Sequence, residues 1–291
     1  MAGTGKSHLL ASALLLPLLG GLLAGCADGG GLFQSNAARA DAVAREANPP
    51  LTKTLINTQG FDIVAYYRQG APNDPRLAVF IEGDGVAYIS RYQRAYDPTP
   101  EKPVALQLAA RHPAPNILYL ARPCQFTGGN KARNCDSAYW TSHRFAPEAI
   151  TAMNQALDTY LRHSGAREVT LYGYSGGAMV ALLLAGQRRD VAAMVTVAGM
   201  LDHQAWTSHF GDTPLYGSRN SLEVADALRR LPQRHFIGDR DKQVPPGLTA
   251  PFLRRIGLRP EAFITELRDT DHDCCWADLW PQLSRMAPVQ P

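Results

Sequence analysis

The chain has 291 residues, of which 45% are hydrophobic and 19% are charged, and its formal net charge is +3. This length and apolar content favour one large α/β core. The mild, scattered charge argues against a nucleic-acid partner.

The N-terminal segment has the pattern of an export signal. An apolar run over residues 9–23 follows Lys6 and His8; it is too short to span a membrane comfortably and has the size of a signal-peptide core. The run ends in Leu-Ala-Gly-Cys at residues 23–26, which resembles the lipobox of bacterial lipoproteins. The resemblance implies that residues 1–25 are removed and that Cys26 is lipidated. The mature protein would then be anchored to a membrane of the cell envelope, and the absence of an acidic residue directly after Cys26 permits sorting to the outer membrane.

The next segment, residues 26–50, is small, polar and alanine-rich without an apolar stripe, so we expect a flexible tether there. The folded domain is then expected to span residues 51–291. Residues 53–56 and 61–67 predict a hairpin of edge strands. The short apolar run over residues 77–81 is typical of a central strand.

Strand and helix patterns alternate along the rest of the chain. Strands are predicted at residues 117–120, 169–172, 193–198, 234–237 and 262–267. Helices are predicted at residues 106–111, from 147 to a C-terminal cap at Gly165, and at 178–185, 222–231 and 277–286. Such alternation predicts a mostly parallel, twisted sheet of about eight strands with helices on both faces. Residues 199–221 show little regular pattern, and we expect a cap or a loop that faces the substrate.

Export would place the four remaining cysteines in an oxidising compartment, where an even number favours disulfides. Cys124 and Cys135 bracket one glycine-containing loop, so we expect a bridge between them, with two free thiols as the alternative. Cys274 and Cys275 are neighbours, and their state is left open. No spacing typical of zinc ligands is present, so no metal is expected.

The most informative motif is Gly-Tyr-Ser-Gly-Gly at residues 173–177, between a predicted strand and a predicted helix. A strand that reverses into a helix within so few residues needs glycines, because side chains there would collide. Such a turn exposes the hydroxyl of Ser175 at a helix N-terminus, where negative charge is favoured. Ser175 is therefore predicted to be a nucleophile, and the alternative is a simple N-cap serine.

A serine nucleophile needs an imidazole that takes its proton and a carboxylate that orients the imidazole. Acidic residues follow the strand at 234–237, and His272 follows the last strand. Ser, Asp and His therefore come in that order, each at the C-terminal end of a separate strand, where ligands gather in open α/β sheets. From about residue 52 onward the chain resembles the α/β-hydrolase-fold family.

The resemblance assigns the acid. In that family the pattern G-x-x-D-x-x-V-P commonly carries it, and the pattern matches residues 238–245, which implies Asp241 rather than Asp239. Asp202, after an earlier strand, remains an alternative. His272 is the implied base.

An acyl-transfer enzyme also needs two N–H donors for the oxyanion, one from the residue after the nucleophile and one from a loop after the third strand. We expect the N–H groups of Gly176 and Asp84, with Gly85 as the near alternative to Asp84. Glu82 stands where many members of the family have histidine. An ordinary turn is the competing interpretation of this loop.

These expectations add up to an exported, lipid-anchored serine hydrolase that acts on small or lipid-like carboxylic esters without a cofactor. Amidase, peptidase, thioesterase or acyltransferase chemistry would use the same residues. A lipid-anchored binding protein on the same fold is the alternative from another class. Three further histidines, His143, His203 and His209, lie on segments that could line the pocket but are expected to be structural or solvated.

Overall fold

The structure is a computed structural model in which residues 1–3, 34–70, 74–90 and 92–288 are described. The fold lies in the unit that begins at Ser35. Cys26 and nearly all of the predicted signal peptide lie outside the described residues.

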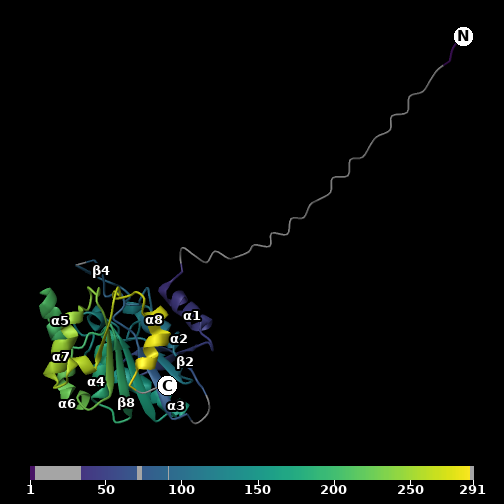
Figure 1. Cartoon of the computed structure of the whole chain (residues 1–291). Helices are drawn as coiled ribbons and strands as arrows, with labels where there is room; N and C mark the ends of the chain where they lie inside the picture. Colours follow the sequence, from purple (N-terminus) through teal and green to yellow (C-terminus); the bar gives the residue numbers. More distant parts are fainter. Residues whose placement is uncertain (4–33, 71–73, 91, 289–291) are drawn as a thin grey trace. The chain divides into compact units, whose positions relative to one another are not determined.

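An eight-stranded sheet, in the order β1-β2-β6-β3-β7-β8-β9-β10, forms the centre of this unit. Figure 1 shows the sheet with helices packed around it. The strands are β1 (Thr52–Asn57), β2 (Asp62–Arg68), β3 (Arg76–Ile81), β6 (Ile117–Leu120), β7 (Glu168–Tyr174), β8 (Val191–Val197), β9 (Gln233–Gly238) and β10 (Ile264–Leu267). Strands from β6 to β10 along this order pair in parallel, and the β1–β2 and β2–β6 pairs are antiparallel. The predicted mostly parallel sheet with an antiparallel hairpin at its edge is confirmed. A separate small hairpin joins β4 (Tyr88–Ser90) to β5 (Gln93–Arg94).

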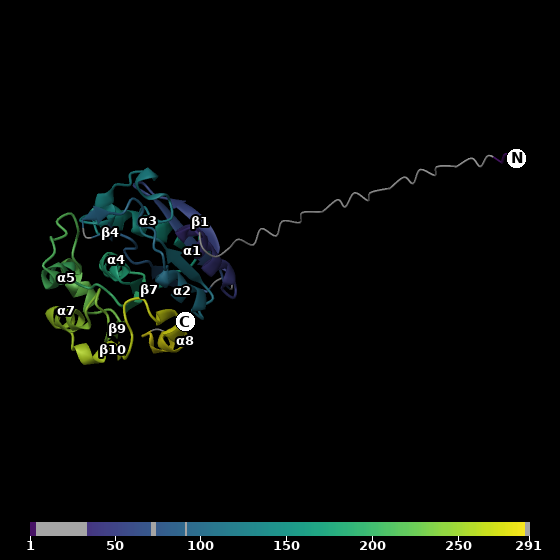
Figure 2. The same ribbon diagram turned by 90° about the horizontal axis from the view of Figure 1, so that it is seen from above.

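Helices cover both faces of the sheet. They are α1 (Asn36–Glu46), α2 (Val104–Arg111), α3 (Pro147–Ser164), α4 (Gly176–Ala185), α5 (His203–Phe210), α6 (Ala225–Leu228), α7 (Thr249–Arg255) and α8 (Trp276–Leu283). Viewed along the sheet, α3, α4 and α7 lie on one side and α1, α2 and α8 on the other (Figure 2). Successive strand residues point to opposite faces, so Leu77 and Val79 of β3 join the first core, whereas Ala78 and Phe80 join the second.

The long helix α3 has the start, the end and the buried face that its sequence predicts. Pro147 occupies its first turn, and Gly165, with φ of 72°, ends it in the left-handed conformation that glycine adopts without steric cost. Met153, Leu157 and Tyr160 are buried at steps of three and four, the spacing of one helix face. The amphipathic helix predicted here is confirmed.

The predicted flexible tether is wrong for residues 36–46, which form α1. Ser35 caps this helix by accepting a hydrogen bond from the backbone N–H of Ala38, and Ala40 and Ala44 are buried in the core that contains α2. Alanines give little apolar signal in a sequence, although they are the best helix formers. The folded unit therefore begins before residue 51.

A second helix was also missed, because α5 lies inside the segment expected to be irregular. The Asp202 side chain caps it by accepting from two backbone N–H groups, and Gly211 ends it with φ of 65°. The helix predicted at residues 222–231 is shorter, a 3-10 turn over Ser221–Val224 followed by α6. Among the described residues, no helix is long and apolar enough to cross a membrane.

Two disulfides lie in the loops that follow β6 and β10. Cys124 and Cys135 are bridged, with Cα atoms 5.7 Å apart, as predicted. The neighbours Cys274 and Cys275, whose state the sequence leaves open, are also bridged to each other.

Candidate active site

The turn between β7 and α4 presents Ser175 at the C-terminal edge of the sheet. Ser175 has φ of 51° and ψ of −124°, a strained conformation for a residue with a side chain. A Cβ atom on Gly173 would lie 2.5 Å from the Cα of Ala178, and one on Gly177 would lie 2.3 Å from the carbonyl oxygen of Ile81. Both flanking glycines are therefore required by close backbone approach, which explains the motif.

Ser175, His272 and Asp241 form one continuous hydrogen-bonded chain. The Ser175 Oγ is 2.9 Å from His272 Nε2, and His272 Nδ1 is 2.8 Å from Asp241 Oδ2. The three residues come from loops after β7, β10 and β9, so strands far apart in sequence bring them together at one sheet edge. Hydroxyl, imidazole and carboxylate have the distances that proton transfer from the serine requires.

The local sequence around Asp241 fixes its carboxylate. Its Oδ1 accepts hydrogen bonds from the backbone N–H groups of Gln243 and Val244, both at 2.8 Å, which leaves Oδ2 for the imidazole. The two alternative acids are engaged elsewhere: Asp239 accepts from the backbone of Thr270, and Asp202 caps α5. Asp241 is the carboxylate that faces His272.

The backbone and ring of His272 are also held in place. Its carbonyl oxygen accepts hydrogen bonds from Tyr174 Oη at 3.1 Å and from Trp276 Nε1 at 2.8 Å. The Tyr174 ring lies 5.3 Å from the imidazole ring. Sequence reasoning missed this role of Tyr174, although its position inside the Gly-x-Ser-x-Gly turn places it beside the histidine loop.

The loop after β3 lies against the nucleophile. Ile81 pairs with Gly173 across the two parallel strands, so the following loops emerge side by side. A Cβ atom on Gly83 would be 3.2 Å from that of Ser175. The N–H groups of Asp84 and Gly176 have no hydrogen-bond partner among the described residues, which leaves both able to donate to a bound group.

Two of the neighbouring loop positions are constrained. The Gly83 N–H donates to the Glu82 side chain, and a Cβ atom on Gly85, whose φ is 68°, would lie 1.9 Å from the carbonyl oxygen of Pro98. Gln125 supports the loop by donating to the Gly83 carbonyl oxygen at 2.9 Å. Asp84 and Gly85 both remain candidates for the second donor.

A buried charge cluster surrounds Asp84. Its carboxylate pairs with Arg122 at 3.1 Å and with Arg144 at 2.6 Å, and both arginine side chains are almost fully buried. Burial would raise the pKa of Asp84, but the two guanidinium groups outweigh it and hold the pKa below its usual value. Arginines scattered along the sequence gave no signal of this cluster, because the pairing depends on the tertiary fold.

Glu82 is buried between the loop and α2. Its carboxyl accepts from the Ala105 N–H at 3.3 Å and from Tyr119 Oη at 3.1 Å, in addition to its own loop. Burial raises the pKa of Glu82 to about 7 despite these donors.

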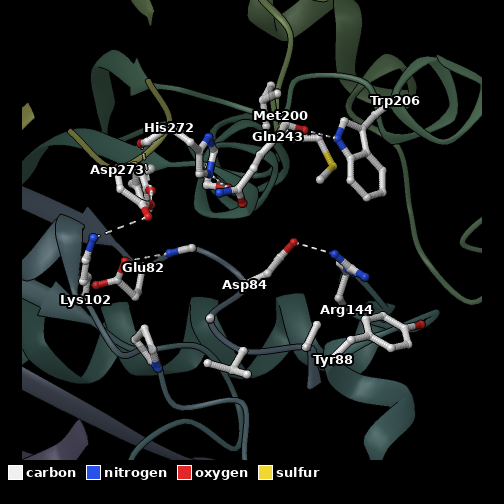
Figure 3. Close-up of a pocket in the computed structure, with 18 of the residues that line it drawn as sticks. Glu82, Asp84, Tyr88, Lys102, Arg144, Met200, Trp206, Gln243, His272 and Asp273 are labelled. Atoms are coloured by element: carbon white, nitrogen blue, oxygen red, sulfur yellow. Dashed lines mark hydrogen bonds and ion pairs between the residues drawn. The ribbon is translucent and has the colours of Figure 1, made fainter. Parts of the chain in front are cut away.

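A cavity of about 770 Å³ opens above these groups (Figure 3). Ser175 and His272 line it, together with the loop at Glu82–Gly85, the β4 hairpin and the α5 segment. The lining mixes charged and apolar side chains: Lys102, Arg144, Asp273, Met200, Trp206 and Leu215. The segment expected to face the substrate, residues 199–221, does supply part of this wall.

The other candidate histidines lie outside the reaction centre. His203 is buried with its ring stacked on Phe145 at 6.0 Å, and burial lowers its pKa. His143 contacts Ser142 Oγ, and His209 packs on Phe210. Among the described residues, no group of three or more potential metal ligands is clustered.

A mostly parallel eight-stranded sheet with helices on both faces, and with Ser, Asp and His loops at the C-terminal ends of its strands, is the α/β-hydrolase fold. The prediction of this fold is confirmed by solved structures that the chain resembles. No protein-family model matches the chain, and a search of curated protein sequences finds no significant match.

The similar structures include two whose whole length is nearly covered. Est1E from Butyrivibrio proteoclasticus has a TM-score of 0.54 at 13% identity, with 79% of this chain and 95% of that chain covered. An α/β serine hydrolase homologue from Coxiella burnetii has a TM-score of 0.54 at 13% identity, with 81% and 94% covered. An acylaminoacyl peptidase from Pyrococcus horikoshii matches with a TM-score of 0.52 at 10% identity, over 76% of this chain and 37% of that one. Identities this low establish a shared fold and do not carry over an activity.

Proposed function

We propose that this protein is a serine hydrolase that cleaves carboxylic esters through an acyl-enzyme. The observation that carries the proposal is the unbroken chain of hydrogen bonds from Ser175 Oγ through His272 to Asp241, with Ser175 and His272 lining an open cavity. His272 Nε2 takes the serine proton as Oγ attacks the ester carbonyl carbon. Asp241 stabilises the imidazolium that forms, and His272 then gives the proton to the leaving alcohol.

The tetrahedral intermediate places its negative charge on the former carbonyl oxygen. In our proposal, the N–H groups of Gly176 and Asp84 donate to that oxygen. Water, activated by His272 in the same way, attacks the acyl-enzyme and releases the carboxylic acid. The same groups can cleave amides or thioesters, and the similarity to an acylaminoacyl peptidase makes amides the first alternative substrate to test.

The decisive experiment combines covalent labelling with turnover. A fluorophosphonate should label the wild-type protein at Ser175, and p-nitrophenyl acetate and butyrate should be hydrolysed. Ser175→Ala should abolish labelling and lower kcat by a factor on the order of 10³ or more while the fold persists. Ser208→Ala is the matched control, because Ser208 is an exposed serine on α5. Equal ester hydrolysis by wild type and Ser175→Ala would instead favour a binding protein without turnover.

We further propose that Cys26 carries a lipid that anchors the mature protein to the bacterial envelope. The absence of an acidic residue directly after Cys26 favours the outer membrane over the inner membrane. The support is the four-residue match to the lipobox after an apolar run of signal-peptide size. Metabolic incorporation of labelled palmitate should occur in the wild type and be lost in Cys26→Ser.

A further inference from the structure

Large apolar side chains are exposed on two segments that also contribute residues to the cavity wall. Tyr88, Ile89, Tyr92 and Tyr96 belong to the β4 hairpin and its continuation, and Phe210 and Tyr216 belong to the α5 segment. We call these six residues the apolar rim. Their side chains are 42–90% exposed, and Tyr92 is the most exposed of them. Elsewhere in the described part of the domain, the large exposed apolar side chains are Leu55 and Met286.

The rim is continuous with the cavity wall on both sides. Tyr88 lines the cavity itself, and Phe210 packs against the cavity residue Trp206 with ring centroids 5.6 Å apart. In Figure 3, Trp206 lies above Arg144 and Tyr88 lies below it. Figure 1 places the β4 hairpin and α5 toward the same end of the domain. Tyrosine and tryptophan are the residues that favour the interface between water and lipid.

The point at which the chain enters the domain lies at the same end. Asn36 in the first turn of α1 donates to the carbonyl oxygen of Thr99 at 2.9 Å, and Arg39 donates to that of Glu101 at 3.2 Å. Pro100 and Glu101 line the cavity. The start of α1 is therefore fixed to the cavity wall.

Because α1 is folded, the chain available between Cys26 and the domain is only residues 27–35. A chain of that length spans at most about 35 Å when fully extended. A domain of this size is roughly 45 Å across. A lipid on Cys26 would therefore hold the cavity end near the bilayer, and the opposite end, where α4 finishes, could not reach it.

From these observations we propose that the apolar rim docks on the lipid bilayer, so that the cavity mouth faces the membrane and takes amphiphilic acyl esters from it. The proposal rests on the proposed lipid anchor and ester hydrolysis. The rim supplies the contact surface, the fixed start of α1 sets the orientation, and the cavity above Ser175 receives the substrate.

The test uses the mature, lipidated protein reconstituted into vesicles of phosphatidylethanolamine and phosphatidylglycerol. Native cysteines within the domain are bridged, so a fluorophore can be attached to Gln93→Cys on β5 or, as the matched control, to Gln187→Cys beyond the far end of α4. Lipids with a nitroxide near the headgroup should quench the dye at position 93 several-fold more than the dye at position 187. Equal quenching, or stronger quenching at position 187, would overturn the proposal. Shielding at position 93 only in native envelopes would indicate a protein partner instead and would overturn it as well.

Quenching does not depend on turnover, so the measurement is repeated in Ser175→Ala, where it should be unchanged even if the proposed hydrolase activity is wrong. A second variant tests the substrate route. The double substitution Ile89→Ser and Tyr92→Ser changes rim residues that do not line the cavity. Hydrolysis of a short water-soluble ester should be unchanged, and hydrolysis of an ester embedded in vesicles should fall about tenfold. Equal loss on both substrates would contradict a docking role.

Discussion

The buried carboxyl group of Glu82 should make the free energy of unfolding depend on pH, by an amount that can be calculated from its pKa. Glu82 is 1% exposed, and its carboxyl group accepts hydrogen bonds from two backbone N–H groups and from Tyr119 Oη. Burial raises the pKa of Glu82 from 4.5 to about 7 in the folded protein. We predict that Glu82→Gln removes the part of the pH dependence of the free energy of unfolding that falls between pH 4.5 and about 7.

The sign follows from which state holds the proton. Between pH 4.5 and about 7 the unfolded chain loses the proton of Glu82 while the folded protein keeps it. The free energy of unfolding therefore falls as the pH rises through this window, and the loss is complete above the folded pKa. At 1.36 kcal/mol per pKa unit, the loss amounts to about 3 kcal/mol. Glutamine does not titrate, so the variant should lack this loss.

The assay is equilibrium urea unfolding of wild type and Glu82→Gln across pH 4.5 to 8. The difference in free energy of unfolding between them should change by about 3 kcal/mol across the window, in favour of the variant at high pH. Glu261→Gln, at an exposed position, is the control and should run parallel to wild type. A constant difference between wild type and Glu82→Gln at every pH would refute the reasoning, because it would mean that the buried carboxyl does not titrate differently in the two states.

Three further predictions concern the site and its supports. Asp241→Asn should lower kcat for a p-nitrophenyl ester by roughly 10³-fold or more, because the imidazole loses its charged partner. The control variant Asp239→Asn should leave kcat near the wild-type value. Similar effects of the two substitutions would contradict the assignment of Asp241 as the acid. Replacing Cys124 and Cys135 by serine should lower the free energy of urea unfolding by about 2–3 kcal/mol, and no change would mean that the bridge does not form. Gly173→Ala should lower stability by about 1–3 kcal/mol in thermal melts, since its Cβ would meet the Cα of Ala178 at 2.5 Å, and an unchanged melting temperature would contradict the turn geometry.

The meeting of Ser175, Asp241 and His272 could be predicted because each follows a recognisable strand, and parallel strands deliver their C-terminal loops to one edge of a sheet. The spacing within each loop added local information. The G-x-x-D-x-x-V-P pattern pointed to Asp241, and in the structure the backbone N–H groups of Gln243 and Val244 hold its Oδ1, which leaves Oδ2 for the imidazole.

Features that depend on burial by distant residues could not be predicted in the same way. Helix α1 was missed because its packing uses Ala40 and Ala44, whose apolar signal is weak in the sequence. The pairing of Asp84 with Arg122 and Arg144 was missed because arginines have no periodic pattern that reveals their partners. In both cases the structure depends on contacts with residues that are distant in the sequence.

The charges of that cluster also explain how a carboxylate can lie beside a proposed oxyanion donor. A Cβ atom on Gly176 would be 2.1 Å from Asp84 Oδ1, so Asp84 lies directly against the residue whose N–H is expected to hold the oxyanion. An unpaired carboxylate there would oppose negative charge by a few kcal/mol, on the order expected for close unit charges in a protein site. Arg122 and Arg144 together reverse the sign, because two positive charges and one negative charge leave a net positive cluster. The same ion pairs hold the Asp84 side chain in place while its N–H has no partner in the described part of the chain. The paired carboxylate therefore both positions the proposed donor and makes its surroundings favourable for an oxyanion.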